Sequence, residues 1–315
     1  MNKPSIVSGI QPTGPLHLGN YLGALKNWLE IQNSGKYDCF FFIADYHSIT
    51  EDYDAQEKRK QIFELACDYL AAGLDPKKSI IFIQSQVPEC TELAWIFNTL
   101  TPVAELERMT QFKDKSQRQA KNINMGLFAY PILQAADILL YKGGLVPVGQ
   151  DQVQHVELTR DCARWFNNKY KVKYFPESKP LLTETPKIMS LLAPENKMSK
   201  SLGDKHWLGI DELPELFAEK IGKAVSTPAG IENLKTIYQA FKRKMAGEFN
   251  PEKMAETKKI IAKGIADYFA DFRAKKEKFK EDKKFVLDIL AEGRQKAQAI
   301  AQKNIKEIKK IIGVE

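Results

Sequence analysis

The sequence of 315 residues is 43% hydrophobic and 28% charged, with a formal net charge of +7. This composition is typical of a folded globular protein, and the length predicts about two domains. The longest apolar run, residues 39–44, is far too short to span a bilayer, and the first five residues lack the apolar core of a secretory signal. We therefore expect neither a membrane protein, nor a secreted protein, nor a disordered one.

Positive charge is concentrated at the C-terminal end of the chain. Residues 251–315 hold 17 Lys and Arg residues against 11 Asp and Glu residues, which is most of the net charge. Such an asymmetry indicates either a nucleic-acid partner or a solvated lysine-rich helical face, and charge alone favours the solvated face. The four cysteines form no C-x-x-C pair and no zinc-like cluster with histidine, so we expect a reducing, cytoplasmic location and no structural metal.

Short apolar segments alternate with helical patterns in the first half of the chain. The strand candidates are residues 5–8, 38–44, 79–84 and 144–148. Helical patterns separate them at about residues 19–34, 54–73, 90–100 and 126–142. This alternation predicts an α/β fold with an open parallel sheet, in which ligands bind at the carboxyl ends of the strands. The loops after Ser8, Ala44 and Val148 are therefore the places where we expect a site.

The pattern changes after about residue 186. Residues 186–203 look like a loop, and from Asp211 onward the pattern is helical and polar, with apolar residues at helical spacing over 285–312. We predict an α/β domain over residues 1–190, with a helical insertion at about 85–143. A smaller helical domain is predicted over residues 191–315, and its last helix can pack back on the first domain.

The first candidate site is the loop of residues 8–20, between the first strand and the first long helix. Its two prolines and three glycines let the backbone approach a ligand, and Gly19 leaves room for a flat group such as adenine. His17 and Asn20 share one face of the helix start, where free N–H groups favour phosphate. A purely structural loop in which Asn20 caps the helix is the alternative, and the spacing alone favours it.

The second candidate is the loop of residues 195–204. Lys197 and Lys200 lie three apart among small hydroxyl residues, and a glycine follows. This pattern is typical of a loop that neutralises phosphate with flexible point charges. On its own, however, the pattern favours an ordinary lysine-rich surface loop, because such loops are common.

Together the two loops resemble the paired HIGH and KMSKS motifs of the class I aminoacyl-tRNA synthetases. The second motif matches without a substitution at residues 197–201, here called the KMSKS loop, whereas the first has Asn20 in place of its last histidine, as in the tryptophan branch. Further segments resemble bacterial tryptophanyl-tRNA synthetases in order and spacing: residues 8–14, 105–113, 135–141, 146–155 and 189–191. The chain is thus similar to that family over nearly its whole length.

The resemblance implies a fold, a reaction and partners. The fold is a Rossmann-like catalytic domain followed by a helical domain on the anticodon side of tRNA. The reaction activates L-tryptophan with ATP to tryptophanyl-adenylate and pyrophosphate, and then transfers tryptophan to tRNA(Trp). Mg²⁺ would bridge the phosphates of ATP and need no protein cage. The family also implies a homodimer made partly through the helical insertion.

The resemblance also implies roles for individual residues. Those implied to bind ATP are Gln11, Pro12, Thr13, Gly19, Asn20, Gly149, Gln150, Asp151, Ile188, Lys197, Met198, Ser199, Lys200 and Ser201. Among them, Asp151 would contact the ribose hydroxyls and Ile188 would pack near adenine. Those implied to act in catalysis, by positioning and by neutralising phosphate charge, are His17, Asn20, Lys115, Lys197, Lys200 and Ser201.

The choice of amino acid can be argued from one helix face. Tyr130, Gln134 and Asp137 recur at helical spacing in an apolar segment, so Asp137 is a poorly hydrated carboxylate that needs a hydrogen-bond donor. The indole N–H is such a donor, and the family places this aspartate on it; an Arg or Lys partner is the alternative. The resemblance adds Val7, His47 and Gln152 to this tryptophan pocket, although a packed loop histidine fits His47 equally well.

Three other functions compete with this one. The first is another class I synthetase, above all the tyrosyl enzyme, because Gln134 stands where methionine is expected and glutamine occurs there in tyrosine-specific relatives. The second is a nucleotidylyltransferase that does not act on tRNA, and the third is a non-catalytic RNA-binding relative. ATP–pyrophosphate exchange with each of the twenty amino acids would separate all of these.

Overall fold

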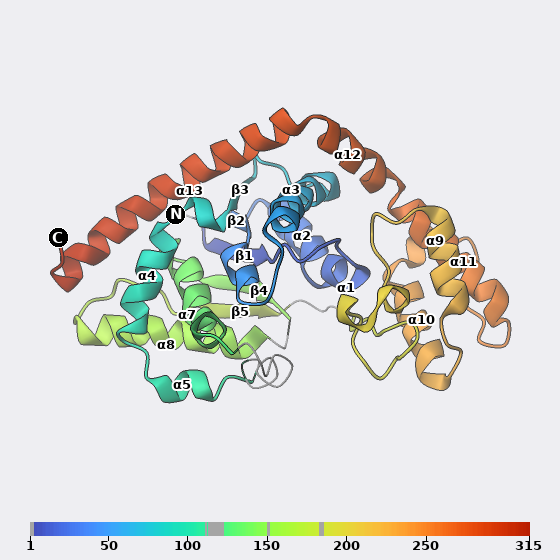
Figure 1. The fold of residues 1–315 in the computed structure, drawn as a ribbon, viewed down its shortest axis with the longest axis horizontal. Helices are drawn as coiled ribbons and strands as arrows, with labels where there is room; N and C mark the ends of the chain where they lie inside the picture. The colour runs from blue at the N-terminus through green and yellow to red at the C-terminus, as the bar shows by residue number, and fades with distance from the viewer. Residues whose placement is uncertain (1–2, 111, 113–122, 150–151, 183–185) are drawn as a thin grey trace.

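The computed structural model shown in Figure 1 describes residues 3–110, 112, 123–149, 152–182 and 186–315. Its centre is a five-stranded sheet in which every recorded pairing is parallel. The strands are β1 (Ser5–Ile10), β2 (Asp38–Ile43), β3 (Ser79–Ile83), β4 (Leu145–Val148) and β5 (Lys179–Leu182), in the order β3-β2-β1-β4-β5. The predicted α/β class and the four predicted strands are confirmed.

Helices cover both faces of the sheet. They are α1 (Leu18–Asn20), α2 (Lys26–Ser34), α3 (Ala55–Ala72), α4 (Glu89–Asn98), α5 (Val103–Glu107), α7 (Met125–Leu140), α8 (Val153–Lys169), α9 (Pro214–Lys223), α10 (Pro228–Ala240), α11 (Met254–Tyr268), α12 (Ala270–Glu281) and α13 (Lys283–Ile312). The helix predicted at about 19–34 is interrupted, because a π-helical turn at Tyr21–Leu25 separates α1 from α2.

Two elements had no counterpart among the predictions. Strand β5 has the sequence Lys-Pro-Leu-Leu and lies at the edge of the sheet, where proline and lysine are tolerated and no apolar run is needed. Helix α8 is amphipathic, with Val156, Thr159, Cys162 and Phe166 on its buried face. Polar residues between these positions hide that spacing from a search for apolar segments.

The strand order reverses beside β1, and this places the ligand site. Strands β2 and β3 follow β1 on one side, whereas β4 and β5 lie on the other. In open parallel sheets the crevice at such a switch point, outside the carboxyl ends of the strands, is where ligands bind. Both the loop after β1 and the turns after β2 and β3 open onto this edge.

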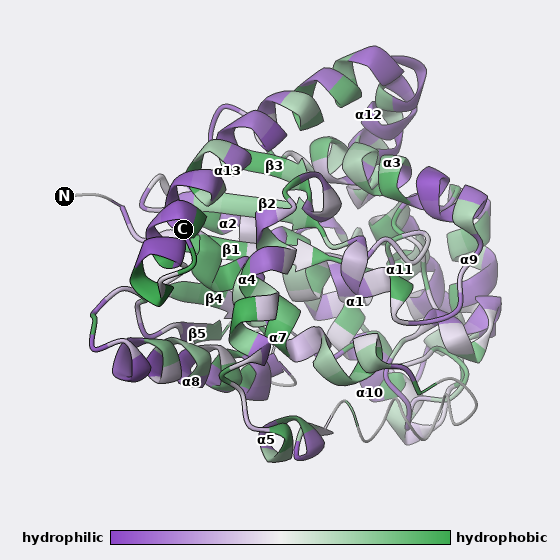
Figure 2. Cartoon of the chain, turned by 60° about the vertical axis from the view of Figure 1, so that its left-hand side comes forward, coloured by the Kyte–Doolittle hydropathy of each residue, from purple (hydrophilic) through white to green (hydrophobic). Residues whose placement is uncertain are grey.

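The core on one face of the sheet continues into the C-terminal helices. Trp28 of α2 stacks on Phe41 of β2 with ring centroids 4.6 Å apart, and the same cluster of buried residues extends to Phe217 of α9 and Ile265 of α11. In Figure 2 the central strands are coloured hydrophobic, whereas α12 and α13 carry many hydrophilic residues. Side chains of the helical region therefore pack in the same core as the sheet.

Helix α13 lies along the outer edge of the sheet, as Figure 1 shows. A Cβ atom on Gly293 would lie 1.8 Å from the carbonyl oxygen of Ile81 in β3, so only glycine allows this approach of helix to strand. Asn304 of the same helix donates a hydrogen bond to the Leu140 carbonyl at 2.7 Å. The helix thereby shields the edge strand β3. None of the helices in the described part of the chain is long and apolar enough to cross a membrane.

Candidate active site

The loop after β1 ends in a reciprocal helix cap. His17 is the N-cap of α1, and its Nδ1 accepts a hydrogen bond from the Asn20 backbone N–H at 3.3 Å. Asn20 Oδ1 accepts in return from the His17 N–H at 3.2 Å. The spacing of the two residues is therefore that of a capping box, with histidine in the capping position. A Cβ atom on Gly19 would lie 2.9 Å from His17 Cε1, so the glycine makes room for the imidazole.

The His17 imidazole is neutral at physiological pH. It is buried, and burial together with the charges of Lys200 and Lys197 lowers its pKa to about 4. A neutral imidazole can keep its Nδ1 as the acceptor that the cap requires. His17 therefore orders the start of α1 without adding charge to a region that already holds two lysines.

The KMSKS loop lies directly against the loop after β1. Lys200 Nζ donates hydrogen bonds to the carbonyl oxygens of Thr13, at 2.8 Å, and Pro15, at 3.2 Å. The pKa of Lys200 is lowered to about 8, chiefly by burial; the charge of Asp68 opposes the shift and that of Lys58 adds to it. The structure thus brings the two predicted loops into contact although they are nearly 190 residues apart in sequence.

The rest of the KMSKS loop combines buried and exposed residues. Met198 is buried, and its N–H donates to the carbonyl of Ile188, also buried, at 3.0 Å. Ser199 caps a short 3₁₀ turn, with its Oγ 2.9 Å from that of Ser201. Lys197 is exposed. The loop is therefore fixed at Met198, with Lys197 and Ser201 exposed and Ser199 and Lys200 half-buried.

Backbone and side-chain contacts tie the KMSKS region to the C-terminal helices. The Leu18 N–H donates to the Leu208 carbonyl at 3.0 Å, next to an antiparallel bridge between His17 and Gly209. On α9, the buried Lys220 pairs with Glu212 at 2.6 Å and with Asp204, just after the loop, at 3.1 Å. The segment that follows the KMSKS loop is therefore bonded both to the start of α1 and to α9.

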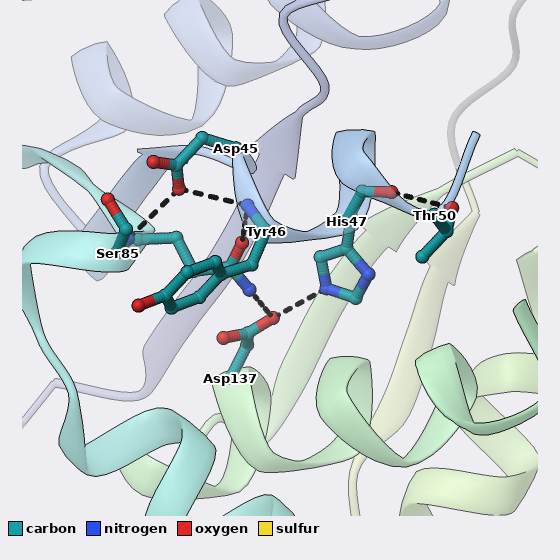
Figure 3. Close-up of polar contacts among 7 residues, drawn as sticks. Asp45, Tyr46, His47, Thr50, Ser85 and Asp137 are labelled. Atoms are coloured by element: carbon teal, nitrogen blue, oxygen red, sulfur yellow. Dashed lines mark hydrogen bonds and ion pairs between the residues drawn. The ribbon is translucent and has the colours of Figure 1, made fainter. Parts of the chain in front are cut away.

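Asp137 lies at the centre of a second, fully buried polar cluster, shown in Figure 3. It projects from α7, and its Oδ2 is 2.8 Å from His47 Nε2 and accepts a hydrogen bond from Gln84 Nε2 at 2.7 Å. His47 comes from the 3₁₀ turn after β2 and Gln84 from the turn after β3. Because a carboxylate only accepts, both partners act as donors. The protein therefore supplies two donors to Asp137, from histidine and glutamine, where the indole N–H or an Arg or Lys was expected from the sequence.

The donors to Asp137 are themselves held in place. Gln84 Oε1 accepts from the Tyr46 N–H at 3.1 Å, which fixes which end of the amide faces Asp137. Asp45 Oδ1 accepts from the N–H groups of Tyr46, at 3.0 Å, and Ser85, at 2.9 Å, and so joins the carboxyl ends of β2 and β3 (Figure 3). Burial raises the pKa of Asp45, whereas its hydrogen bonds act against the shift.

Other residues predicted for the tryptophan pocket lie on or near α7. Tyr130 Oη is 3.0 Å from His155 Nε2, and its ring lies edge-on to His47 with centroids 6.3 Å apart. Gln134 and Gln152 are half-buried. Val7 has no exposed surface and packs in the core between sheet and α7. The face that carries Tyr130, Gln134 and Asp137 is therefore as predicted, and His47 meets it.

Comparisons with known proteins identify the family to which the chain belongs. The sequence model for tRNA synthetases class I (W and Y), the enzymes for tryptophan and tyrosine, matches residues 1–292. The chain belongs to this family. A tryptophan–tRNA ligase from Clostridium tetani is 42% identical over 99% of the chain and 96% of its own length.

Two solved synthetases have the same fold over almost the entire length. One is the tryptophanyl-tRNA synthetase of Mycoplasma pneumoniae, with 32% identity, a TM-score of 0.87, and coverage of 100% of this chain and 99% of that one. The other is the Campylobacter jejuni tryptophanyl-tRNA synthetase complexed with ADP and tryptophan, with 31% identity, a TM-score of 0.85, and coverage of 98% and 99%.

Not every predicted residue of the synthetase can be placed. Lys115, Gln150 and Asp151 lie outside the described residues. Gly149 follows β4, and its carbonyl accepts from the Gln152 N–H at 3.0 Å at the start of α8. Within the described ranges, no group of three or more His, Cys, Asp or Glu side chains is arranged to hold a metal ion.

Sequence reasoning missed three residues of the synthetase that the structure brings to the site. Gln84 and Asp45 follow β3 and β2, and their signal was a polar residue directly after an apolar strand. Lys58 on α3 donates to the Pro12 carbonyl in the loop after β1 at 2.9 Å. Nothing in the local sequence distinguishes Lys58 from the other basic residues at the start of that helix.

Proposed function

We propose that this synthetase is a tryptophan–tRNA ligase that forms tryptophanyl-adenylate from L-tryptophan and ATP and then charges tRNA(Trp). The observation that carries the proposal is the buried carboxylate of Asp137, held by two donors where β2 and β3 end. Full-length similarity to a tryptophan–tRNA ligase supports the choice of amino acid. The alternatives without aminoacylation find no support in this family membership.

Recognition of tryptophan would use the second oxygen of Asp137. Both hydrogen bonds from His47 and Gln84 go to Oδ2, so Oδ1 remains to accept the indole N–H. Indole can only donate, and a buried carboxylate whose acceptor is left unpaired penalises a substrate that lacks the donor. Gln134 and Tyr130, about one and two turns before Asp137 respectively, would flank the ring.

Activation needs no nucleophile from the protein. The tryptophan carboxylate oxygen attacks the α-phosphorus of ATP, the bond to the β-phosphate oxygen breaks, and pyrophosphate leaves. A ribose hydroxyl at the end of tRNA then attacks the adenylate carbonyl and releases AMP. The protein has to position these groups and neutralise charge. Lys197, Lys200 and Ser201 would hold the departing phosphates, and Lys200 would release the carbonyls of the loop after β1 to do so.

Mg²⁺ would enter as part of the nucleotide substrate. Among the described residues, the charged groups that bond the loop after β1 are the ammonium groups of Lys58 and Lys200, which cannot ligate a cation. The described residues around this loop therefore do not fit a protein-held Mg²⁺. We place the ion on the phosphate oxygens of ATP, the hard oxygen ligands that it prefers.

The further partners are tRNA(Trp) and a second copy of the chain, in the cytoplasm. Exposed lysines such as Lys278 on α12 and Lys284 on α13 offer sequence-independent phosphate contacts. Trp95 on α4 and Val103 on α5 are 71% and 62% exposed, and both helices contact α7, so this region offers an apolar surface for a homodimer. Reversing the charge of Lys278 and Lys284 should flatten the salt dependence of tRNA binding and leave amino-acid activation intact.

ATP–pyrophosphate exchange with each of the twenty amino acids tests the function directly. We expect exchange with tryptophan and at most traces with tyrosine. Exchange with tyrosine alone would overturn the amino-acid assignment, and absence of exchange with every amino acid would overturn the activation step. Charging of tRNA(Trp) in the same preparation then tests the transfer step.

A further inference from the structure

Lys58 lies outside both motifs yet contacts the loop after β1, here called the ATP loop. It is the fourth residue of α3 and is only 8% exposed. Its Nζ donates a hydrogen bond to the Pro12 carbonyl at 2.9 Å. Burial lowers the pKa of Lys58, and the carboxylates of Glu51 and Asp45 oppose that shift. A buried ammonium group needs partners of this kind, so the contact with Pro12 is part of what holds the lysine there.

The peptide between Pro12 and Thr13 is held at both ends. Its carbonyl oxygen accepts from Lys58, and its N–H donates to the Gln11 carbonyl at 2.9 Å. Because the peptide unit is planar and trans, fixing these two groups fixes the plane and hence the direction of the chain toward Gly14. Gly14 itself has φ of +102°, so the turn that follows depends on this fixed approach.

Helix α3 holds the same stretch of chain at a second point. The buried Tyr69 Oη accepts from the Ile10 N–H at 3.1 Å and donates to the Phe42 carbonyl at 3.0 Å. Ile10 and Pro12 are thus both bonded to one rigid helix that packs against the sheet. Lys200, in contrast, reaches Thr13 and Pro15 from the KMSKS loop.

We propose that Lys58 is a positioning residue that keeps the ATP loop in its binding shape while Lys200 moves to the phosphates. The inference rests on the proposed function, in which Lys200 gives up the carbonyls of Thr13 and Pro15 when ATP binds. Once that happens, Lys58 is the lysine still bonded to the loop, through Pro12. The contribution of Lys58 is therefore specific to the nucleotide, since tryptophan binds at Asp137, on α7.

The test compares Lys58→Met with Lys58→Arg. Methionine retains the aliphatic stem without charge or donor, whereas arginine retains both. We expect Lys58→Met to raise KM for ATP about tenfold, the effect of losing one hydrogen bond to a charged group, with KM for tryptophan unchanged within about twofold. Lys58→Arg should recover most of the ATP affinity. The matched control is Lys60→Met, an exposed lysine on the same helix, which should behave like the parent.

The readouts are ATP–pyrophosphate exchange, direct ATP binding by calorimetry without tryptophan, and the melting temperature. An unchanged KM for ATP in Lys58→Met would overturn the proposal, as would equal increases in both KM values. A fall in kcat at unchanged KM would also overturn it, because that result describes a phosphate contact made in the transition state. If the parent protein binds ATP but shows no exchange with tryptophan, the proposed function fails, and the calorimetric comparison still decides the role of Lys58.

Discussion

The two halves of the site, the lysine-rich half around the loop after β1 and the tryptophan half around Asp137, differ in which groups form their hydrogen bonds. Around the loop after β1, lysine ammonium groups bond backbone carbonyls, and much of the KMSKS loop is exposed. Around Asp137, two buried side chains from different elements, His47 and Gln84, bond its carboxylate. The Tyr46 N–H fixes the orientation of the Gln84 amide. The first arrangement can exchange its partners for phosphate oxygens, whereas rearranging the second would leave buried polar groups unpaired.

This difference suits the two substrates. ATP brings several negative charges that change position during the reaction, so flexible cations are appropriate. The indole ring brings one donor that has to be distinguished from other side chains, so a fixed acceptor is appropriate. We therefore expect substitutions near Asp137 to alter amino-acid selection, and substitutions in the lysine-rich half to alter the chemical step or ATP affinity.

The largest expected effect is that of Asp137→Asn. An amide can turn its NH₂ toward the indole N–H, so the charged acceptor is lost and kcat/KM for tryptophan should fall roughly 100-fold or more. ATP binding should be largely spared, because the carbonyls bonded by Lys200 and Lys58 lie in the loop after β1, whereas Asp137 is on α7. Calorimetry with ATP and exchange kinetics with tryptophan measure the two quantities. An unchanged kcat/KM for tryptophan would contradict the indole assignment.

The next effect is that of Lys200→Ala, and Lys197→Ala should resemble it. Removing the cation that neutralises the departing phosphates should slow adenylate formation roughly 100-fold, while tryptophan affinity changes little. Single-turnover formation of adenylate and equilibrium binding of tryptophan separate the two. Lys205→Ala, an exposed lysine just beyond the loop, is the control. Weaker tryptophan binding with a normal chemical rate would show that the phosphate role is wrong.

Much of this contrast was visible in the sequence, and the site residues that were missed, Gln84 and Lys58 among them, share a cause. The two loops and the face of α7 that carries Asp137 are local patterns; spacing and residue type marked them as candidates, and the resemblance of the paired motifs to a known family gave the two loops their function. The pairing of Gln84 with Asp137 depends on β2 and β3 being neighbours in the sheet, and no spacing along the chain encodes that. Lys58 meets Pro12 only because α3 packs across the carboxyl end of β1. Strand β5 was missed for a different reason, since an exposed edge strand needs no apolar run.

Gln84→Met should produce an intermediate effect that belongs to the tryptophan half alone. The substitution removes one of two donors to Asp137 and leaves the Tyr46 N–H bonded only to Asp45. We expect KM for tryptophan to rise about tenfold, as for loss of a hydrogen bond to a charged group, with KM for ATP unchanged. Gln86→Met changes an exposed glutamine two residues away and serves as the control. Equal changes in both KM values would mean that the cluster does not act on tryptophan alone.

The smallest effect, a pH dependence, belongs to the lysine half. The pKa of Lys200 is lowered from 10.5 to about 8, chiefly by burial, so its ammonium charge is lost as the pH rises through about 8. Since the profile of kcat/KM for ATP reports the free enzyme, this quantity should fall about threefold between pH 7.5 and 8.5. In Lys200→Arg the guanidinium stays charged over this range, so the decline should disappear. A decline of kcat/KM for ATP of the same size in Lys200→Arg would show that a group other than Lys200 titrates in this range. The lysine half of the site would then lack the pH dependence that sets it apart from the tryptophan half.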